Sequence, residues 1–326
     1  MGPVDLGLIL SYQCQSKCAH CLYNCGPSWK EWMDLEDVKS ALVATKHWDH
    51  QYRVHITGGE PFLNFPLLIE SVKIASELDI PVYVETNAGW AYRDKDVNEK
   101  LKLLIDAGLR SIMISVSPFH AESIPPERTL RLIKIATRLF GIKNLYIYQQ
   151  KWLDMIVQFG IEHNNSLNNY IDAYGSKEAG RLFWQGYGLI AGGRAGYQLG
   201  YLTEMKSVDA FVNEKCTYEI LFADHSHFDL YGNYIPAFCG GISLGNWKNI
   251  AEIENNLKNG IFNQIVGILL NRGVYGLYEY AFDKFGYKPR DDGYAGKCHL
   301  CVDIRRFLVK NGEFPELSPL QFYEDK

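Results

Sequence analysis

Three cysteines near the start of the chain constrain it more than any other feature. Cys14, Cys18 and Cys21 lie within eight residues, in the run CQSKCAHC. Thiolates at this spacing can hold an iron-sulfur cluster by three of its irons and leave the fourth iron without a protein ligand. An open iron can bind and reduce a ligand, whereas a fully ligated cluster mainly passes electrons. The spacing therefore predicts a catalytic cluster.

Composition and charge narrow the class of protein. The chain has 326 residues, 47% of them apolar and 22% charged, which is typical of a globular protein with a sizeable core. Its net charge of -5 provides no overall positive potential for binding nucleic acid or anionic lipid. No apolar run approaches the roughly 20 residues of a membrane span, and MGPVDLGLIL at the start lacks the features of a signal peptide. We therefore expect a cytoplasmic protein that binds a small molecule or a peptide, and neither nucleic acid nor a membrane.

The eight cysteines fall into two sets. The first comprises Cys14, Cys18, Cys21 and Cys25, and the second comprises Cys216, Cys239, Cys298 and Cys301. Thiols clustered at ligand spacings in a large chain without an export signal favour metal binding over disulfides. For the second set, a structural zinc site is the alternative.

The first half of the chain alternates between strand and helix patterns. Strands are predicted at 4–11, 53–57, 81–85, 111–115 and 144–148, with helices at 34–46, 66–78, 97–107 and 128–140. Strands that alternate with helices indicate an α/β fold with a parallel sheet, open or curled toward a barrel. The loops that follow the strands would then share one face, where such folds place their sites.

The second half follows a different pattern. A sixth strand is predicted around 188–192, and the strand-helix alternation ends near residue 205. Short strands around 228–238 precede a helical stretch at 249–271. We therefore expect one domain over residues 1–205 and a smaller α+β domain over 206–326, packed closely because no Pro- or Ser-rich linker separates them.

Two motifs in the expected order give the chain a family resemblance. Cys-x3-Cys-x2-Cys follows the first predicted strand, and Gly58-Gly59-Glu60-Pro61 follows the second. In both respects the chain resembles the radical S-adenosylmethionine (SAM) superfamily. The resemblance implies a partial (β/α)6 barrel similar to a TIM barrel. For GGEP alone, a tight turn is the alternative interpretation.

The resemblance also implies the chemistry. In the family, the open iron of a 4Fe-4S cluster chelates the methionine amine and carboxylate of S-adenosyl-L-methionine, and one electron then cleaves a carbon-sulfur bond. The 5'-deoxyadenosyl radical so formed removes a hydrogen atom from the substrate. An external electron donor such as flavodoxin or ferredoxin would supply the electron.

Cofactor contacts carry over from the family to matching positions. The resemblance assigns the amine to the GGEP turn, adenine to His20, ribose and methionine to Asn87, Ser115 and Ser117, and the carboxylate to Arg194 in GGRAG. The alternatives are a solvated loop histidine, turn-forming polar side chains and a structural salt bridge.

The second cysteine set resembles an auxiliary-cluster domain. The segments FDLYGNYIPAFCGGISLGNW and CHLCVDIRRFL resemble the shorter twitch domain rather than the two-cluster SPASM form. Four thiolates at Cys216, Cys239, Cys298 and Cys301 would close one auxiliary 4Fe-4S cluster. Such a cluster can accept an electron from the substrate, pass electrons to the first cluster, or serve architecture alone.

Cys25 is the remaining thiol. It would donate a hydrogen atom to a substrate radical if it faces the cavity, and it would be an inert buried thiol otherwise.

Three hypotheses for function follow. The first is a radical SAM oxidoreductase that acts on a peptide or protein side chain. The second is a dehydrogenase of a small molecule similar to a sugar or an aminocyclitol, and the third is an electron carrier without enzymatic activity. The cluster motif begins at residue 14, which predicts no separate leader-peptide recognition domain upstream.

Overall fold

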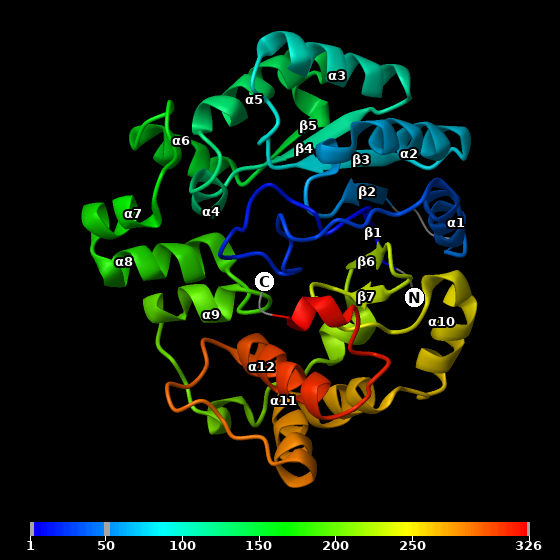
Figure 1. Cartoon of the computed structure of the whole chain (residues 1–326), viewed down its shortest axis with the longest axis vertical. Coiled ribbons are helices and arrows are strands. Elements are labelled where there is room, and N and C mark those ends of the chain that lie inside the picture. Colours follow the sequence, from blue (N-terminus) through cyan, green and yellow to red (C-terminus); the bar gives the residue numbers. More distant parts are fainter. Residues whose placement is uncertain (1–2, 49–52, 325–326) are drawn as a thin grey trace. The chain divides into compact units, whose positions relative to one another are not determined.

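The computed structural model of the chain describes residues 3–48 and 53–324, which form two compact units (Figure 1). The first, here called the sheet unit, comprises Val4–Cys18 and Cys25–Ala173. The second, called the pocket unit, comprises Ala19–Asn24 and the chain from Tyr174 onward. The two units divide the first cysteine set, because Cys14, Cys18 and Cys25 belong to the sheet unit and Cys21 to the pocket unit.

The sheet unit is built on five parallel strands in the order β5-β4-β3-β2-β1. The strands are β1 (Asp5–Ile9), β2 (Arg53–Thr57), β3 (Val82–Thr86), β4 (Ser111–Ser115) and β5 (Leu145–Tyr148). The predicted strands at 53–57 and 111–115 match β2 and β4 residue for residue. The predicted α/β class, with a parallel sheet of the partial-barrel type, is confirmed.

Helices connect successive strands of this sheet, and two more follow its last strand. The connecting helices are α1 (Leu35–Thr45), α2 (Phe65–Glu77), α3 (Asp94–Asp106), α4 (Pro118–Ala121) and α5 (Pro126–Phe140), and α6 (Gln150–Gln158) and α7 (Leu167–Tyr174) come after β5. Asp34 caps α1 at its N-terminus, because the Asp34 carboxylate accepts a hydrogen bond of 2.7 Å from the amide of Asp37. Helices α1 and α2 pack side by side, as do α3 and α5 (Figure 1).

The carboxyl ends of the parallel strands bring the sequence motifs to one edge. The cysteine loop follows β1, the GGEP turn follows β2, Asn87 follows β3 and Ser117 follows β4. Parallel strands all end at the same edge of a sheet, so loops far apart in sequence become neighbours there.

The pocket unit is mainly helical. It contains α8 (Ser176–Arg181), α9 (Ala195–Leu199), α10 (Ile250–Lys258), α11 (Gln264–Phe285) and α12 (Lys297–Asn311), with α11 packed on α12. An antiparallel hairpin joins β6 (His225–Asp229) to β7 (Tyr234–Pro236), as the sequence predicts for 228–238. Two π-helical turns span Leu182–Gly188 and Tyr218–Phe222.

Two predictions for this half need correction. The expected sixth strand at 188–192 is not formed: Gly188 ends a π-helical turn and the chain then runs through an irregular bend, with positive φ angles of 80° at Gly188 and 53° at Gly193. The expected helix at 249–271 is two helices, α10 and α11, separated at Gly260, where φ is 71°. The domain boundary at 205/206 stays a prediction.

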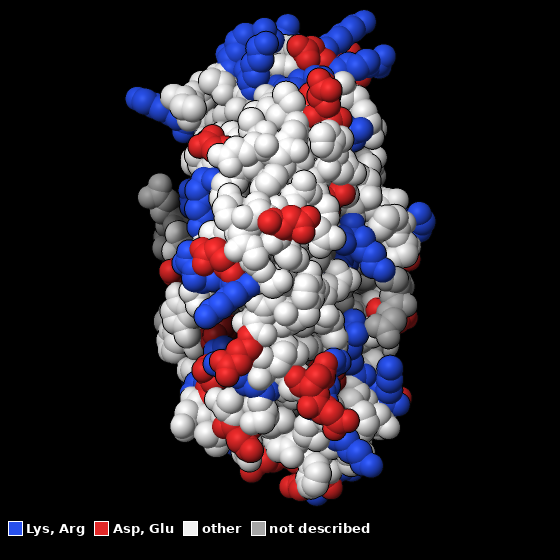
Figure 2. Space-filling model, turned by 90° about the vertical axis from the view of Figure 1, so that its left-hand side faces the viewer, with Lys and Arg blue, Asp and Glu red and all other residues white. Residues whose placement is uncertain are grey.

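Acidic and basic side chains are interspersed on the face of the molecule shown in Figure 2, with uncharged residues between them. Within residues 3–48 and 53–324, no helix combines the length and the apolar character that crossing a membrane requires.

Candidate functional site

The cysteine loop begins directly after β1 and is closed at its base. The Cys14 amide donates to the Gly26 carbonyl, and the Gly26 amide donates to the Tyr12 carbonyl, both at 3.1 Å. These two bonds hold the ends of the segment that contains the first cysteine set. The loop is therefore a fixed feature of the strand edge, as its position after the first strand predicts.

The GGEP turn packs its backbone directly on this loop. The Gly59 amide donates to the Ser11 carbonyl at 2.8 Å, and the Glu60 amide donates to the Gln13 carbonyl at 2.9 Å. A Cβ atom added at Gly59 would lie 1.9 Å from the Gln13 carbonyl oxygen, and one at Gly58 would lie 2.3 Å from that of Ser11. The family resemblance assigns a cofactor contact to this turn, whereas the close approach in the structure is to the cysteine loop itself. Contact with a cofactor stays a prediction, for Pro61 as well.

The Glu60 carboxylate joins the turn to the loop after β3. One oxygen accepts from the Thr86 hydroxyl at 2.9 Å and from the Phe62 amide at 3.2 Å, and the other accepts from the Asn87 amide at 2.9 Å. The side chain is only 1% exposed. Burial raises the pKa of Glu60 from 4.5 to about 7, although the three hydrogen bonds oppose this shift.

Asn87 extends the same network to the first cysteine. Its side-chain amide donates to the Cys14 sulfur at 3.4 Å, and its carbonyl oxygen accepts from Gln15 at 2.7 Å. Hydrogen bonds to cluster sulfurs are one of the ways by which a protein sets cluster properties. The structure therefore places Asn87 at a candidate ligand sulfur, while the ribose contact expected from the resemblance stays a prediction.

Ser115 and Ser117 line a small cavity at the end of β4 together with His120. The Ser117 hydroxyl accepts from the His120 amide at 3.2 Å and lies 2.7 Å from His120 Nδ1. Burial lowers the pKa of His120 to about 4, so the ring is neutral near pH 7. These contacts give Ser117 the turn-forming role that the sequence left open as an alternative.

In the pocket unit, a second glycine turn holds the last cysteine of the triad. The Arg194 amide donates to the Cys21 carbonyl at 3.1 Å, and a Cβ atom at Gly193 would lie 2.2 Å from that same oxygen. The Arg194 side chain is buried. His20 makes an edge-to-face contact with Tyr187, with ring centroids 5.7 Å apart. The expected cofactor contacts of His20 and Arg194 stay predictions.

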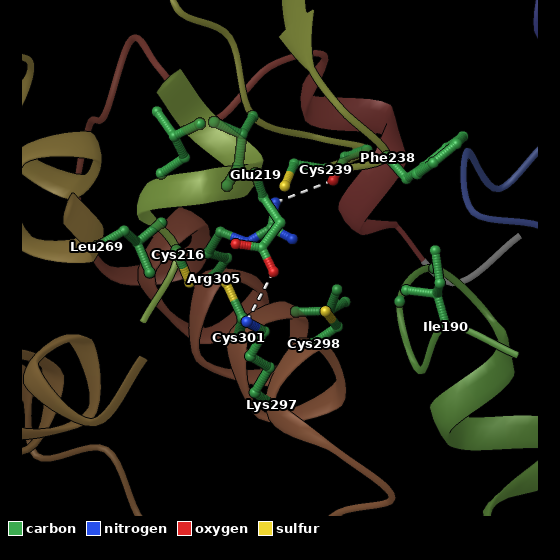
Figure 3. Close-up of a pocket in the computed structure, with 16 residues that line it drawn as sticks. Ile190, Cys216, Glu219, Phe238, Cys239, Leu269, Lys297, Cys298, Cys301 and Arg305 are labelled. Atoms are coloured by element: carbon green, nitrogen blue, oxygen red, sulfur yellow. Dashed lines mark hydrogen bonds and ion pairs between the residues drawn. The ribbon is translucent and has the colours of Figure 1, made fainter. Parts of the chain in front are cut away.

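The second cysteine set converges on one cavity of the pocket unit (Figure 3). Cys216 precedes the π-helical turn, Cys239 follows β7, and Cys298 and Cys301 lie on α12. The cavity opens to solvent, and its volume, including this opening, is about 520 Å³. All four cysteines are free thiols. Residues separated by up to 85 positions in sequence thus present four sulfur ligands to a single space.

The thiols of this cavity shift one another's ionisation. Burial, followed by Cys298 and Cys301, raises the pKa of Cys239 well above its ordinary value. The pKa of Cys298 rises to about 12, mainly through burial and Cys301, and that of Cys216 rises for similar reasons. Such thiols stay protonated near pH 7 unless a cation replaces the protons. The donor set therefore fits a tetrathiolate metal centre, either an iron-sulfur cluster or zinc.

Charged side chains that the sequence analysis did not single out complete this cavity (Figure 3). Lys297 donates to Glu219 at 2.7 Å, and the Arg305 guanidinium donates to the Gly240 carbonyl at 3.0 Å. Arg305 follows Cys301 by four residues, so both lie on one face of α12. That spacing in CHLCVDIRRFL is the signal that could have identified it.

Cys25 is 4% exposed. Its role as a hydrogen-atom donor stays a prediction.

Comparisons with known proteins agree with the motif at the strand edge. Residues 8–158 match the family model of the radical SAM superfamily. The chain is 20% identical over 173 residues to "Putative peptide biosynthesis protein YydG" of Bacillus subtilis, a match that covers 52% of this chain and 50% of that protein. It is 25% identical over 177 residues to "Uncharacterized protein MJ0907" of Methanocaldococcus jannaschii, which covers 49% of this chain and 61% of that protein. The matches thus span between half and two thirds of these relatives.

Among solved structures, BtrN in complex with AdoMet and 2-DOIA aligns with a TM-score of 0.49 at 13% identity. The alignment covers 90% of this chain and 99% of that chain.

The contact between the GGEP turn and the cysteine loop generates the first prediction. Gly59→Ala should lower the free energy of unfolding by at least about 2 kcal/mol, because its Cβ cannot coexist with the Gln13 carbonyl. Gly26→Ala is the matched control in the same loop, since its nearest heavy atom, on Lys17, is 3.9 Å from the added Cβ. Denaturant unfolding of both variants measures the difference. Equal stabilities would contradict the close packing.

The buried Glu60 carboxylate generates a prediction about pH. Between about pH 4.5 and pH 7 the folded chain holds a proton on Glu60 that the unfolded chain has released. Its contribution to stability is therefore present below about pH 4.5 and is lost as pH rises to about 7, by roughly 3 kcal/mol. The stability of the wild-type chain relative to Glu60→Gln, which does not titrate, should thus fall between about pH 5 and pH 8 in unfolding of the metal-free protein. If this difference in stability stayed constant or grew with pH, the Glu60 carboxylate would not be in the buried environment described here.

Proposed function

We propose that this chain is a radical SAM enzyme that removes a hydrogen atom from a peptide or protein side chain, a proposal supported by the match of residues 8–158 to the radical SAM superfamily model. In this proposal, Cys14, Cys18 and Cys21 hold a 4Fe-4S cluster whose open iron binds S-adenosyl-L-methionine. When both are bound, the cluster and S-adenosyl-L-methionine would supply the chemistry: reductive cleavage of the cofactor to a carbon-centred radical. The observation that carries the proposal is the hydrogen-bonded junction of the GGEP turn, Asn87 and the Cys14 sulfur.

The chain's own residues hold this site in place. The Glu60 carboxylate fixes the Asn87 backbone, and the Asn87 side chain then directs its amide to the Cys14 sulfur. A donor at that position stabilises a thiolate, the form that a metal requires. The Glu60 carboxylate is buried as well as hydrogen-bonded within the protein. A cofactor ammonium group would therefore contact the carbonyl oxygens of this turn.

We further propose that Cys216, Cys239, Cys298 and Cys301 hold one auxiliary 4Fe-4S cluster. The convergence of these thiols on one cavity supports a metal centre there. The radical chemistry of the same chain favours iron over zinc, because a redox-active cluster can exchange electrons during turnover and zinc cannot. Whether this cluster accepts or donates electrons depends on the net reaction, and therefore on the substrate.

The description of one relative supports a peptide substrate. YydG of Bacillus subtilis is described as a peptide biosynthesis protein, and the match covers half of each chain. The small-molecule dehydrogenase, acting on a sugar-like or aminocyclitol substrate, is the alternative outcome of the experiment described next.

The class of substrate can be tested by identifying which compound supplies the hydrogen atom that enters 5'-deoxyadenosine. The reduced, reconstituted enzyme should transfer deuterium from a pool of peptides with deuterated side chains into 5'-deoxyadenosine, detected by mass spectrometry. Cys14→Ala should form none, because the cluster then lacks one thiolate ligand. Transfer from deuterated aminocyclitols instead would favour the alternative. An enzyme that forms no 5'-deoxyadenosine at all would favour the electron carrier.

Metal analysis tests the auxiliary centre separately. The reconstituted chain should contain about eight iron and eight sulfide per protein, and Cys239→Ala should contain about half of each. Cys25→Ala is the matched control, since Cys25 is a buried thiol outside both proposed ligand sets, and it should keep the full content. Stoichiometric zinc in the wild-type chain would overturn the auxiliary cluster.

A further inference from the structure

Arg305 is a buried cation whose charge the described residues do not balance. Its side chain is 2% exposed. One guanidinium nitrogen donates to the Gly240 carbonyl at 3.0 Å and to the Tyr323 hydroxyl at 2.6 Å, and both acceptors are neutral. Within residues 3–48 and 53–324, no carboxylate lies within 4.0 Å of it. Burying a charge is costly unless an opposite charge compensates it.

The other cation of the cavity differs in this respect. Lys297 lies 2.7 Å from the Glu219 carboxylate and 3.8 Å from that of Glu214, and it also donates to the Lys215 carbonyl. Its charge is therefore neutralised locally, and its side chain is 21% exposed. Of the two cations beside the cysteines, only Arg305 lacks an anionic partner among the residues that the structure describes.

The cysteine pocket offers the missing negative charge. Arg305 lines the same cavity as the four thiols and lies on the α12 face that carries Cys301. Burial alone would lower the pKa of the guanidinium, but Tyr323, Cys301 and Cys239 raise it above its ordinary value. Interaction with these two sulfurs becomes strong once they are thiolates, because the site is screened from water. Four thiolates around an iron-sulfur core carry a net negative charge.

We propose that Arg305 is the counter-charge of the metal-thiolate centre in the cysteine pocket and that it raises the reduction potential of this centre. The inference rests on the proposed auxiliary cluster. A fixed positive charge favours the reduced form, which carries one more negative charge than the oxidised form. Tyr323 positions the guanidinium, because its hydroxyl accepts from Arg305 and donates to the Gly241 carbonyl.

The test is a redox titration of the reconstituted full chain, followed by electron paramagnetic resonance. The auxiliary signal is identified by its absence from Cys239→Ala. Arg305→Met should lower the auxiliary midpoint potential enough to change the ratio of reduced to oxidised cluster about tenfold at a fixed potential, which is 59 mV for one electron. Arg305→Lys keeps the charge and should stay closer to wild type. Lys297→Met is the matched control, whose shift should be smaller because Glu219 already offsets that charge.

The possible results distinguish the role of Arg305 from the presence of the auxiliary cluster. An Arg305→Met cluster with the wild-type potential, or a larger shift in Lys297→Met, overturns the role of Arg305 and leaves the proposed function standing. Zinc in place of iron overturns the auxiliary cluster and this inference together. If Arg305→Met fails to assemble a cluster, Arg305→Gln decides, since it keeps side-chain hydrogen-bond donors for the Gly240 carbonyl and removes the charge. A lowered potential in Arg305→Gln supports the inference, and an unchanged one overturns it.

Discussion

The buried Glu60 carboxylate is the interaction on which the candidate active site depends. It accepts hydrogen bonds from Thr86, Asn87 and Phe62, and the Glu60 amide is bonded to the cysteine loop. Three segments that follow different strands thereby become one rigid junction. Removing the carboxylate from water is unfavourable and raises its pKa to about 7. The hydrogen bonds from the three donors offset much of this cost.

Close backbone contact is the second constraint, and it acts at both ends of the cysteine triad. In the sheet unit, Gly58 and Gly59 allow the GGEP turn to reach the backbone before Cys14. In the pocket unit, Gly193 packs against Cys21, and Gly240 would place a Cβ only 2.4 Å from the Leu22 carbonyl. Gly240 directly follows Cys239, so the turn that carries this cysteine also supports the segment after Cys21. Within the pocket unit, the segment after Cys21 therefore packs on the turn that follows Cys239.

Much of this architecture follows from local sequence. Strands β2 and β4 are short β-rich runs between clear helical patterns, and Asp34 marks the start of α1. The contacts at the strand edge are harder to predict, because the packing of Gly59 on Gln13 and the bond from Asn87 to Cys14 join residues far apart in sequence. The error at 188–192 has a local cause, since flanking glycines with positive φ end an apolar run that otherwise resembles a strand. Arg305 could have been found from its spacing to Cys301, but only the tertiary structure reveals that its acceptors are neutral and that it has no carboxylate partner among the residues described.

We propose that the cysteine triad holds a cluster with an iron open to S-adenosyl-L-methionine. Electron paramagnetic resonance of the reduced Cys239→Ala chain, recorded before and after addition of the cofactor, would observe this cluster without the proposed auxiliary one. We expect a 4Fe-4S signal whose g values shift when S-adenosyl-L-methionine binds at the open iron. A spectrum that the cofactor leaves unchanged would contradict it.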